Sequence, residues 1–156
     1  MKTKLAALFL TLALFCLSSA AFAQTDGHVM VKPGDLKWAD VPSLPPGAKL
    51  AVIEGPLDKE GAPITFRVKF PANYQIPAHW HPTTEHVTVI SGTLNLGTGD
   101  KLDRAKTSAL PAGGFAVMPA KMNHFGWTKG ETVVQVHGTG PWTINYVNPA
   151  DAPKKK

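Results

Sequence analysis

Proline and glycine punctuation constrains the fold of this chain more than any other feature of its sequence. The 156 residues contain 14 of each, which divide the chain into short runs and favour turns and strands over helices. The runs are rich in β-branched residues, and several alternate apolar with polar side chains, as a half-buried strand does. The predicted strands are 64–70, 85–91, 93–96, 115–118, 132–137 and 143–147, with weaker candidates at 49–54 and 75–79.

Many short strands at regular spacing predict an all-β fold, either a sandwich or a barrel. The length fits one domain, and no internal repeat or linker divides the chain. Residues 101–109 are the only stretch that favours a helical turn, and we expect a loop or a short helix there. We assign 24–48 to an N-terminal arm with one strand, 49–149 to the barrel and 150–156 to a basic C-terminal tail.

The first 23 residues have the pattern of a secretory signal peptide. Lys2 and Lys4 precede an apolar run at 5–17, and the Ala-Phe-Ala of 21–23 is a small-x-small cleavage site. An apolar run this short disfavours a membrane anchor. No twin-arginine pair precedes it, so we expect Sec-type export of the unfolded chain and cleavage after Ala23. The mature protein would then be periplasmic or secreted, without attachment to the membrane.

Charge and cysteine content narrow the possible functions. Cleavage would leave 14 basic and 11 acidic residues, a mild excess with no basic stripe between aromatic residues, so nucleic-acid binding is not expected. The single cysteine, Cys16, lies in the signal segment. The mature chain therefore forms no disulfide, and any metal site in it must use histidine and carboxylate ligands.

The segment from His79 to Glu85 has the spacing of a metal site. His79 and His81 are two residues apart, so on an extended chain both imidazoles point to the same face. The Pro-Thr-Thr of 82–84 lets the chain reverse, and Glu85 can then aim a carboxylate oxygen at the same point. Two histidines and one carboxylate form the facial arrangement that holds redox-active metals. His86, which follows Glu85 on the same strand, should point to the opposite face, and we expect it not to be a ligand.

Two motifs resemble those of the cupin superfamily. Residues 79–92 read HxHxxxE, then six residues and Gly92, and residues 113–124 read Gly, five residues and PxKxxH, ending at His124. The resemblance implies a double-stranded β-helix, or jelly-roll, barrel. It also implies that His79, His81, Glu85 and His124 bind one divalent metal ion per chain.

The chain departs from the cupin pattern at two positions. Cupins usually have glycine where Lys121 stands and asparagine where Thr128 stands. Lys121 suggests a turn that avoids a strongly left-handed backbone. The spacing between the motifs is also slightly long, which indicates an insertion at 102–108.

Residues that share a face with the ligands should line an apolar cavity for a small organic molecule. We expect Val87, Val89, Phe66, Val68 and Phe70 to form its walls. The predicted strand at 132–137 leaves two orientations open. Either Gln135 and His137 or Val134 and Val136 face inward. In the first case His137 acts as a base or a substrate anchor beside the metal; in the second it lies at the rim.

The resemblance is compatible with several functions. One is a metal-dependent enzyme, an oxidoreductase of dioxygenase type in which Glu85, with His137, takes part in catalysis. The alternative is a non-catalytic periplasmic cupin that binds a small molecule or a structural metal. Iron, manganese, nickel, copper, cobalt and zinc all suit the ligand set. Cupin barrels commonly pair through edge strands, so the resemblance implies a homodimer.

Overall fold

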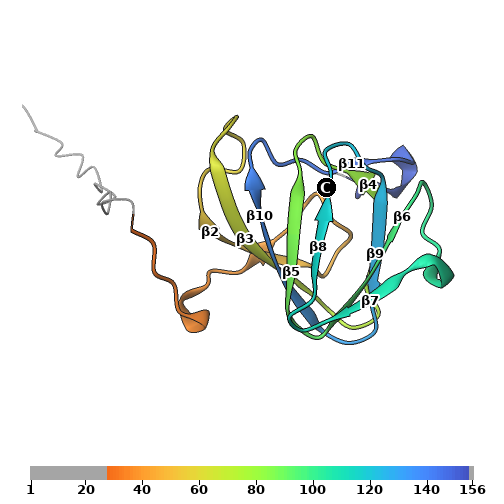
Figure 1. Ribbon diagram of the computed structural model, residues 1–156, viewed down its shortest axis with the longest axis horizontal. Coiled ribbons are helices and arrows are strands. Elements are labelled where there is room, and N and C mark those ends of the chain that lie inside the picture. The colour runs from red at the N-terminus through yellow and green to blue at the C-terminus, as the bar shows by residue number, and fades with distance from the viewer. Residues whose placement is uncertain (1–27, 155–156) are drawn as a thin grey trace, which may run out of the picture.

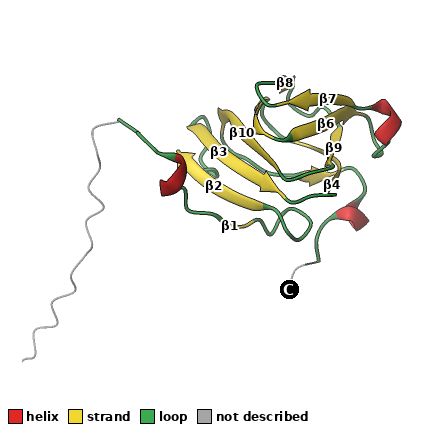
Figure 2. Ribbon diagram, turned by 90° about the horizontal axis from the view of Figure 1, so that it is seen from below, coloured by secondary structure: helices red, strands yellow, loops and turns green. Residues whose placement is uncertain are grey.

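The computed structural model describes residues 28–154, so the predicted signal peptide and its cleavage site lie outside the described residues. Two antiparallel sheets face each other, and the arm leaves the body on one side (Figure 1; Figure 2). Short 3-10 turns are the helical elements in this range: Pro33–Asp35, Arg104–Lys106 and Pro149–Asp151. Within 28–154 there is thus no helix of the length and apolarity that crossing a bilayer requires.

Beyond the first three strands, most strands that follow one another in sequence lie in opposite sheets, which is the arrangement of a jelly roll. The six-stranded sheet has the order β1 (Ala39–Asp40), β2 (Lys49–Glu54), β3 (Pro63–Phe70), β10 (Thr132–Thr139), β5 (Glu85–Ser91) and β8 (Phe115–Met118). The five-stranded sheet has the order β11 (Asn145–Tyr146), β4 (Gln75–Trp80), β9 (His124–Thr128), β6 (Thr93–Thr98) and β7 (Ser108–Pro111). The predicted all-β barrel is therefore confirmed, although β7 and β9 were not predicted.

Alternation along the strands builds the core between the sheets. On β3 every second residue is buried, so that its apolar side chains face the other sheet while the polar ones face outward. On β10 the same alternation buries Val134 and Val136 and leaves His137 exposed. Burial of each such apolar side chain stabilises the fold by about 1.5–3 kcal/mol.

Turns between the strands depend on backbone conformations that the sequence signals only in part. Gly92, between β5 and β6, has a φ of 76°, and a Cβ atom there would lie 2.4 Å from the carbonyl oxygen of Glu131. Lys121 has a φ of 63°, so the prediction that its turn avoids the left-handed region was wrong. The turn is held because the Lys121 N–H donates to the carbonyl of His81 (2.8 Å). This bond helps to offset the ~1–2 kcal/mol that a left-handed non-glycine residue costs.

Thr128, the second departure from the cupin pattern, ties β9 to the turn between β3 and β4. Its side chain is fully buried. The hydroxyl donates to the carbonyl of Pro71 (2.9 Å) and accepts from the N–H of Tyr74 (3.3 Å). The Thr128 N–H also donates to the Tyr74 carbonyl (3.0 Å). The hydroxyl thus satisfies two backbone groups that have little access to water.

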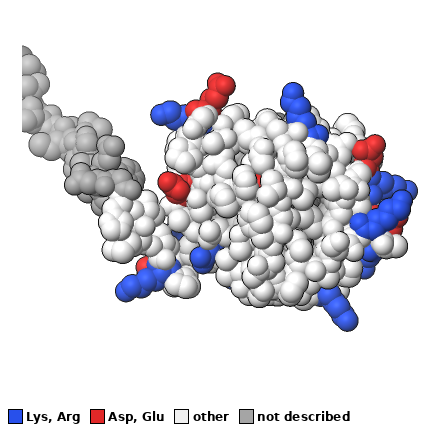
Figure 3. Space-filling view, viewed as in Figure 1, with Lys and Arg blue, Asp and Glu red and all other residues white. Residues whose placement is uncertain are grey.

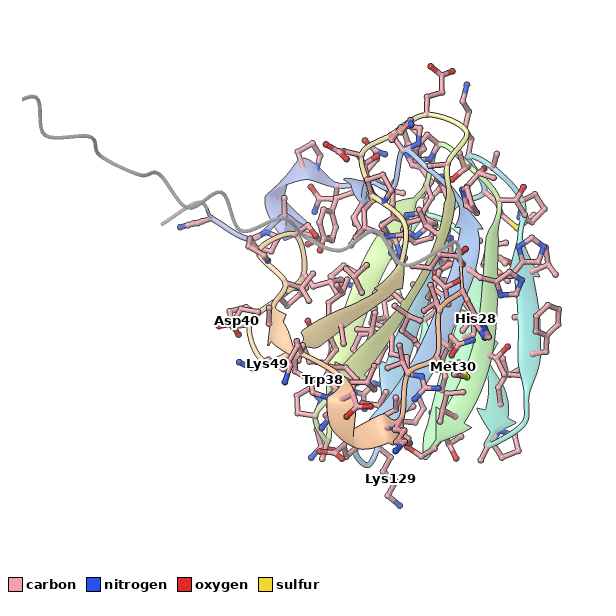
Figure 4. All side chains as sticks on the ribbon, turned by 90° about the vertical axis from the view of Figure 1, so that its left-hand side faces the viewer. His28, Met30, Trp38, Asp40, Lys49 and Lys129 are labelled. Carbon is pink, nitrogen blue, oxygen red and sulfur yellow. The ribbon has the colours of Figure 1, made fainter. Side chains whose placement is uncertain are left out.

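The arm continues past β1 and packs against the barrel. Lys69 lies over the ring of Trp38 at 4.8 Å, and the ammonium of Lys49 contacts the carboxylate of Asp40 at 2.7 Å (Figure 4). Tyr146 donates its hydroxyl to the carbonyl of Ser43 (2.7 Å). These contacts hold the segment from Trp38 to Ser43 against β3, β2 and β11.

We predict that Thr128→Val lowers the free energy of unfolding by about 2 kcal/mol, because valine keeps the shape but leaves two buried backbone groups without a partner. Urea unfolding of the metal-free protein, followed by far-UV circular dichroism, measures the change. Thr128→Ser is the matched control: it keeps the hydroxyl and loses one methyl group, and should cost about 1 kcal/mol or less. Equal stability of Thr128→Val and the wild type would contradict the role of the hydroxyl.

Candidate metal centre

Three histidines from neighbouring positions of the five-stranded sheet converge at one point. His79 lies on β4 and His124 opens β9, and the two are register partners with ring centroids 4.3 Å apart. His81 follows β4, and its ring centroid lies 4.9 Å from that of His79. Each residue is at most 5% exposed, and one potential ligand atom from each lies within 4.8 Å of the others. This cluster, the His triad, can hold a metal ion.

Backbone carbonyls fix the orientation of the three rings. Nδ1 of His79 donates to the carbonyl of Pro77 (2.7 Å), and Nδ1 of His124 donates to that of Met122 (2.9 Å). A carbonyl can only accept, so the proton of each neutral ring is on Nδ1 and the lone pair is on Nε2.

The third ring is fixed in the same way by a more distant partner. Nδ1 of His81 donates to the carbonyl of Thr143 (2.7 Å), 62 residues further along the chain. Metal-binding histidines typically donate their second N–H to such an acceptor. The donor set and its anchoring therefore fit a divalent transition metal.

Glu85 reaches the His triad from the opposite sheet. It opens β5 and is buried, and its Oε2 lies 3.3 Å from Nε2 of His124 and 3.6 Å from Nε2 of His81. Burial acts to raise the pKa of this carboxyl group, but the contacts with His124 and His81 outweigh it and hold the pKa below its usual range. An ionised carboxylate facing two Nε2 atoms can serve as a fourth ligand or accept a proton.

Burial also favours the neutral form of His79 and His81. It lowers the pKa of His79 to about 3, with further lowering by the charges of His124 and His81. Burial likewise lowers the pKa of His81, against the raising effects of Glu85 and of the hydrogen bond to Thr143. Neutral imidazole is the form that binds a metal, so these two histidines are already in the binding form near neutral pH.

An apolar cavity of about 300 Å³ adjoins the triad. As predicted, Phe66, Val68, Phe70 and Val87 line it. Val89 is buried in the core instead and does not line the cavity. Strands of both sheets supply further walls, among them Ile76, Leu94, Phe125, Val134 and Val136. The cavity has the size and lining of a site for a small organic molecule.

Two parts of the site were not predicted because they come from segments without a motif. Trp142 lies between β10 and β11 and stacks on His81 with ring centroids 4.0 Å apart and an interplanar angle of 21°. Its ring also packs edge-on against Phe66 at 5.2 Å. The other part is residues 40–44 of the arm, which line the cavity. In the sequence, only the aromatic side chain of Trp142 indicated a role at the site, and it did not predict the contact with His81.

The remaining histidines lie away from the cavity. His137 is exposed on the outer face of β10, where it stacks on His86 with ring centroids 4.7 Å apart. The assignment of His137 as a catalytic base is therefore corrected: its strand turns Val134 and Val136 inward. His86 points outward, as expected from alternation. His28 is exposed on the arm (Figure 4).

A model of one protein family and several solved structures match this chain. The model, described as the ChrR cupin-like domain, matches residues 26–143. The polyketide cyclase RemF from Streptomyces resistomycificus has a TM-score of 0.65 and 17% identity, over 80% of this chain and 88% of that chain. A candidate acetylacetone dioxygenase from Methylibium petroleiphilum PM1 has a TM-score of 0.62 and 16% identity, over 82% and 86% of the two chains.

A third structure is the complex of Rhodobacter sphaeroides SigE with the anti-sigma ChrR. The similarity has a TM-score of 0.52 and 16% identity, over 69% of this chain and 50% of that chain. At these identities the structures establish a shared fold. No curated protein matches the chain.

We predict that the metal-free protein loses stability as the pH falls from about 6.5 towards 3. The unfolded chain takes up a proton at position 79 below about pH 6.5, whereas the folded protein does so only near pH 3. Urea unfolding with chelator present, at several pH values in this window, gives the slope.

Substitution of the titrating group tests the cause of this slope. His79→Gln should make it shallower and leave the part contributed by His81, while His28→Gln, on the exposed arm, should leave it unchanged. The same slope in wild type and His79→Gln would show that this histidine is not the source.

Proposed function

The chain belongs to the ChrR cupin-like family of the cupin superfamily, and on this premise we propose that it is an exported, metal-dependent enzyme of dioxygenase type that acts on a small organic substrate. The observation that carries the proposal is the His triad with Glu85 at the wall of an apolar cavity. The signal-peptide pattern of residues 1–23 supports export.

Each residue of the site would have a defined role in this function. His79, His81 and His124 would hold the metal through Nε2, with Glu85 as the fourth ligand. When bound, a redox-active ion would supply a Lewis acid and an oxygen-binding centre. Glu85 would accept the proton of an enolic or phenolic substrate, which its ionised state, maintained by its contacts with His124 and His81, and its position near the triad support. The apolar walls would exclude water from the reacting group.

Metal analysis and oxygen uptake test this proposal together. The mature protein, purified from the periplasm, should contain about one divalent metal per chain. His124→Ala should lose most of it, because the metal would keep two of three imidazoles. The iron, manganese, nickel and copper forms should then be assayed for oxygen uptake against a panel of enols and phenols.

Matched variants separate the site from general effects of histidine loss. His137→Ala removes an exposed imidazole of the outer face and should keep both metal and uptake. Absence of uptake by every metal form, with metal bound, would refute the enzyme and leave the metal site intact. Loss of activity in His137→Ala would contradict its placement outside the cavity.

A non-catalytic binding protein is the second candidate. It is favoured by the scarcity of acid–base groups: among the described residues that line the cavity, the carboxylates are Glu85 and Asp40, and Asp40 pairs with Lys49. One solved structure of this fold is the anti-sigma ChrR, a protein bound to SigE rather than named as an enzyme. Metal retention without oxygen uptake would favour this candidate.

We also propose that the protein is a homodimer that uses the outer surface of β5 and β8. Strand β8 is an edge of its sheet, and Ile90, Phe115 and Val117 are 41%, 52% and 44% exposed. The surface over β5 and β8 in this view is largely free of charged side chains (Figure 3). Unpaired edges with apolar side chains favour association with a second strand.

We predict a dimer for the wild type and a monomer for Val117→Lys, because a charge in the middle of this surface must be desolvated on association. Light scattering after size-exclusion chromatography gives the mass. Val29→Lys, at an equally exposed position of the arm, is the control and should remain a dimer. A monomeric wild type, or a dimeric Val117→Lys, would contradict the proposed surface.

A further inference from the structure

Apart from the metal site, the lining of the cavity offers a ligand few polar side chains. Among residues 28–154, those that line it include no lysine, arginine, asparagine or glutamine, and its one hydroxyl-bearing residue is Ser43. Its charged side chains are Glu85 and Asp40. Asp40 lies at the exposed end, with its carboxylate 2.7 Å from the ammonium of Lys49. A ligand would therefore meet polar groups at the triad and, apart from Asp40 and Ser43, apolar walls elsewhere.

Charge balance limits the ligand further. The three imidazoles are neutral when they bind metal, and Glu85 is ionised, so a divalent ion would leave the centre with one net positive charge. One negative charge on the ligand would neutralise it. A second would remain uncompensated in a cavity of low polarity, where an unpaired charge is costly.

The volume of the cavity limits the size of the ligand. A volume of about 300 Å³ lies at the lower end of the range for small-molecule pockets, so the ligand must be small. Trp142 presents one aromatic wall beside His81, and Phe66 and Phe125 present others. Recognition of several hydroxyl groups, as a sugar would need, has few partners on these walls, since among the described residues Ser43, Asp40 and the indole N–H of Trp142 are the polar side-chain groups away from the triad.

We propose that the natural ligand is a small apolar monoanion, a carboxylate or enolate whose charged oxygens bind the metal and whose hydrocarbon part fills the apolar cavity. The proposal rests on the metal site of the proposed function but not on catalysis. It excludes polyhydroxylated acids and compounds with a second charge.

Binding to the zinc-loaded mature protein tests this class without turnover, because zinc is not redox-active. Octanoate, with ten non-hydrogen atoms, is compared with suberate, which adds a second carboxylate to the same chain length, and with glucuronate, a polar monoanion. Octanamide is the uncharged control. Calorimetry and thermal shift should show octanoate binding about tenfold or more tighter than each of the other three.

Two variants complete the test. His124→Ala, depleted of metal, should lose the preference for octanoate over octanamide. Leu57→Lys places a cation at a half-buried position of the wall and should raise the affinity for suberate relative to octanoate. Its folding is checked by circular dichroism.

The outcomes separate this proposal from the proposed function. Suberate or glucuronate binding as tightly as octanoate to the wild type would overturn the ligand class, even if oxygen uptake were found with another substrate. Octanoate selectivity without oxygen uptake would support the ligand class and refute the dioxygenase. Zinc-loaded protein that binds none of the four would overturn the ligand class alone.

Discussion

The hydrogen bonds from three imidazole Nδ1 atoms to backbone carbonyls are the interactions on which the site depends. Two of the acceptors, on Pro77 and Met122, are two residues from their histidines, so local backbone geometry aims those rings. The third acceptor, on Thr143, belongs to a distant segment, which makes the position of His81 a property of the closed barrel. Binding of a metal to this site would therefore be linked to the stability of the fold.

Electrostatics then distinguishes this centre from the rest of the interior. Burial suppresses charge on His79 and His81, whereas contact with the rings maintains charge on Glu85. Around them the walls are almost wholly apolar. Apart from Asp40 and Ser43, the polar groups of the cavity are thus concentrated at the triad, which favours a ligand with one polar and one apolar end.

Much of the candidate site could be predicted because the sequence patterns that indicate it are local. The i, i+2 spacing of His79 and His81, and the turn that precedes Glu85, place three groups together without knowledge of the fold. His137 could not be placed, since both faces of its strand are compatible with alternation; burial of two valines decided it. The roles of Trp142 and the arm depend on contacts between segments far apart in sequence. Strand β9 begins at His124 and contains Gly126, and these two residues weaken the strand pattern in the sequence.

The contribution of the arm to the cavity wall has a dynamic consequence. Residues 40–44 are held by the pairing of β1 with β2 at the edge of the sheet, by the Asp40–Lys49 ion pair, by the Tyr146 hydroxyl on the Ser43 carbonyl and by burial of Leu44. A segment at a sheet edge opens at a lower free energy than the barrel unfolds. Release of these residues would remove one wall of the cavity while strands β2 to β11 stay paired. The residence time of a bound molecule would then depend on how often this edge segment detaches.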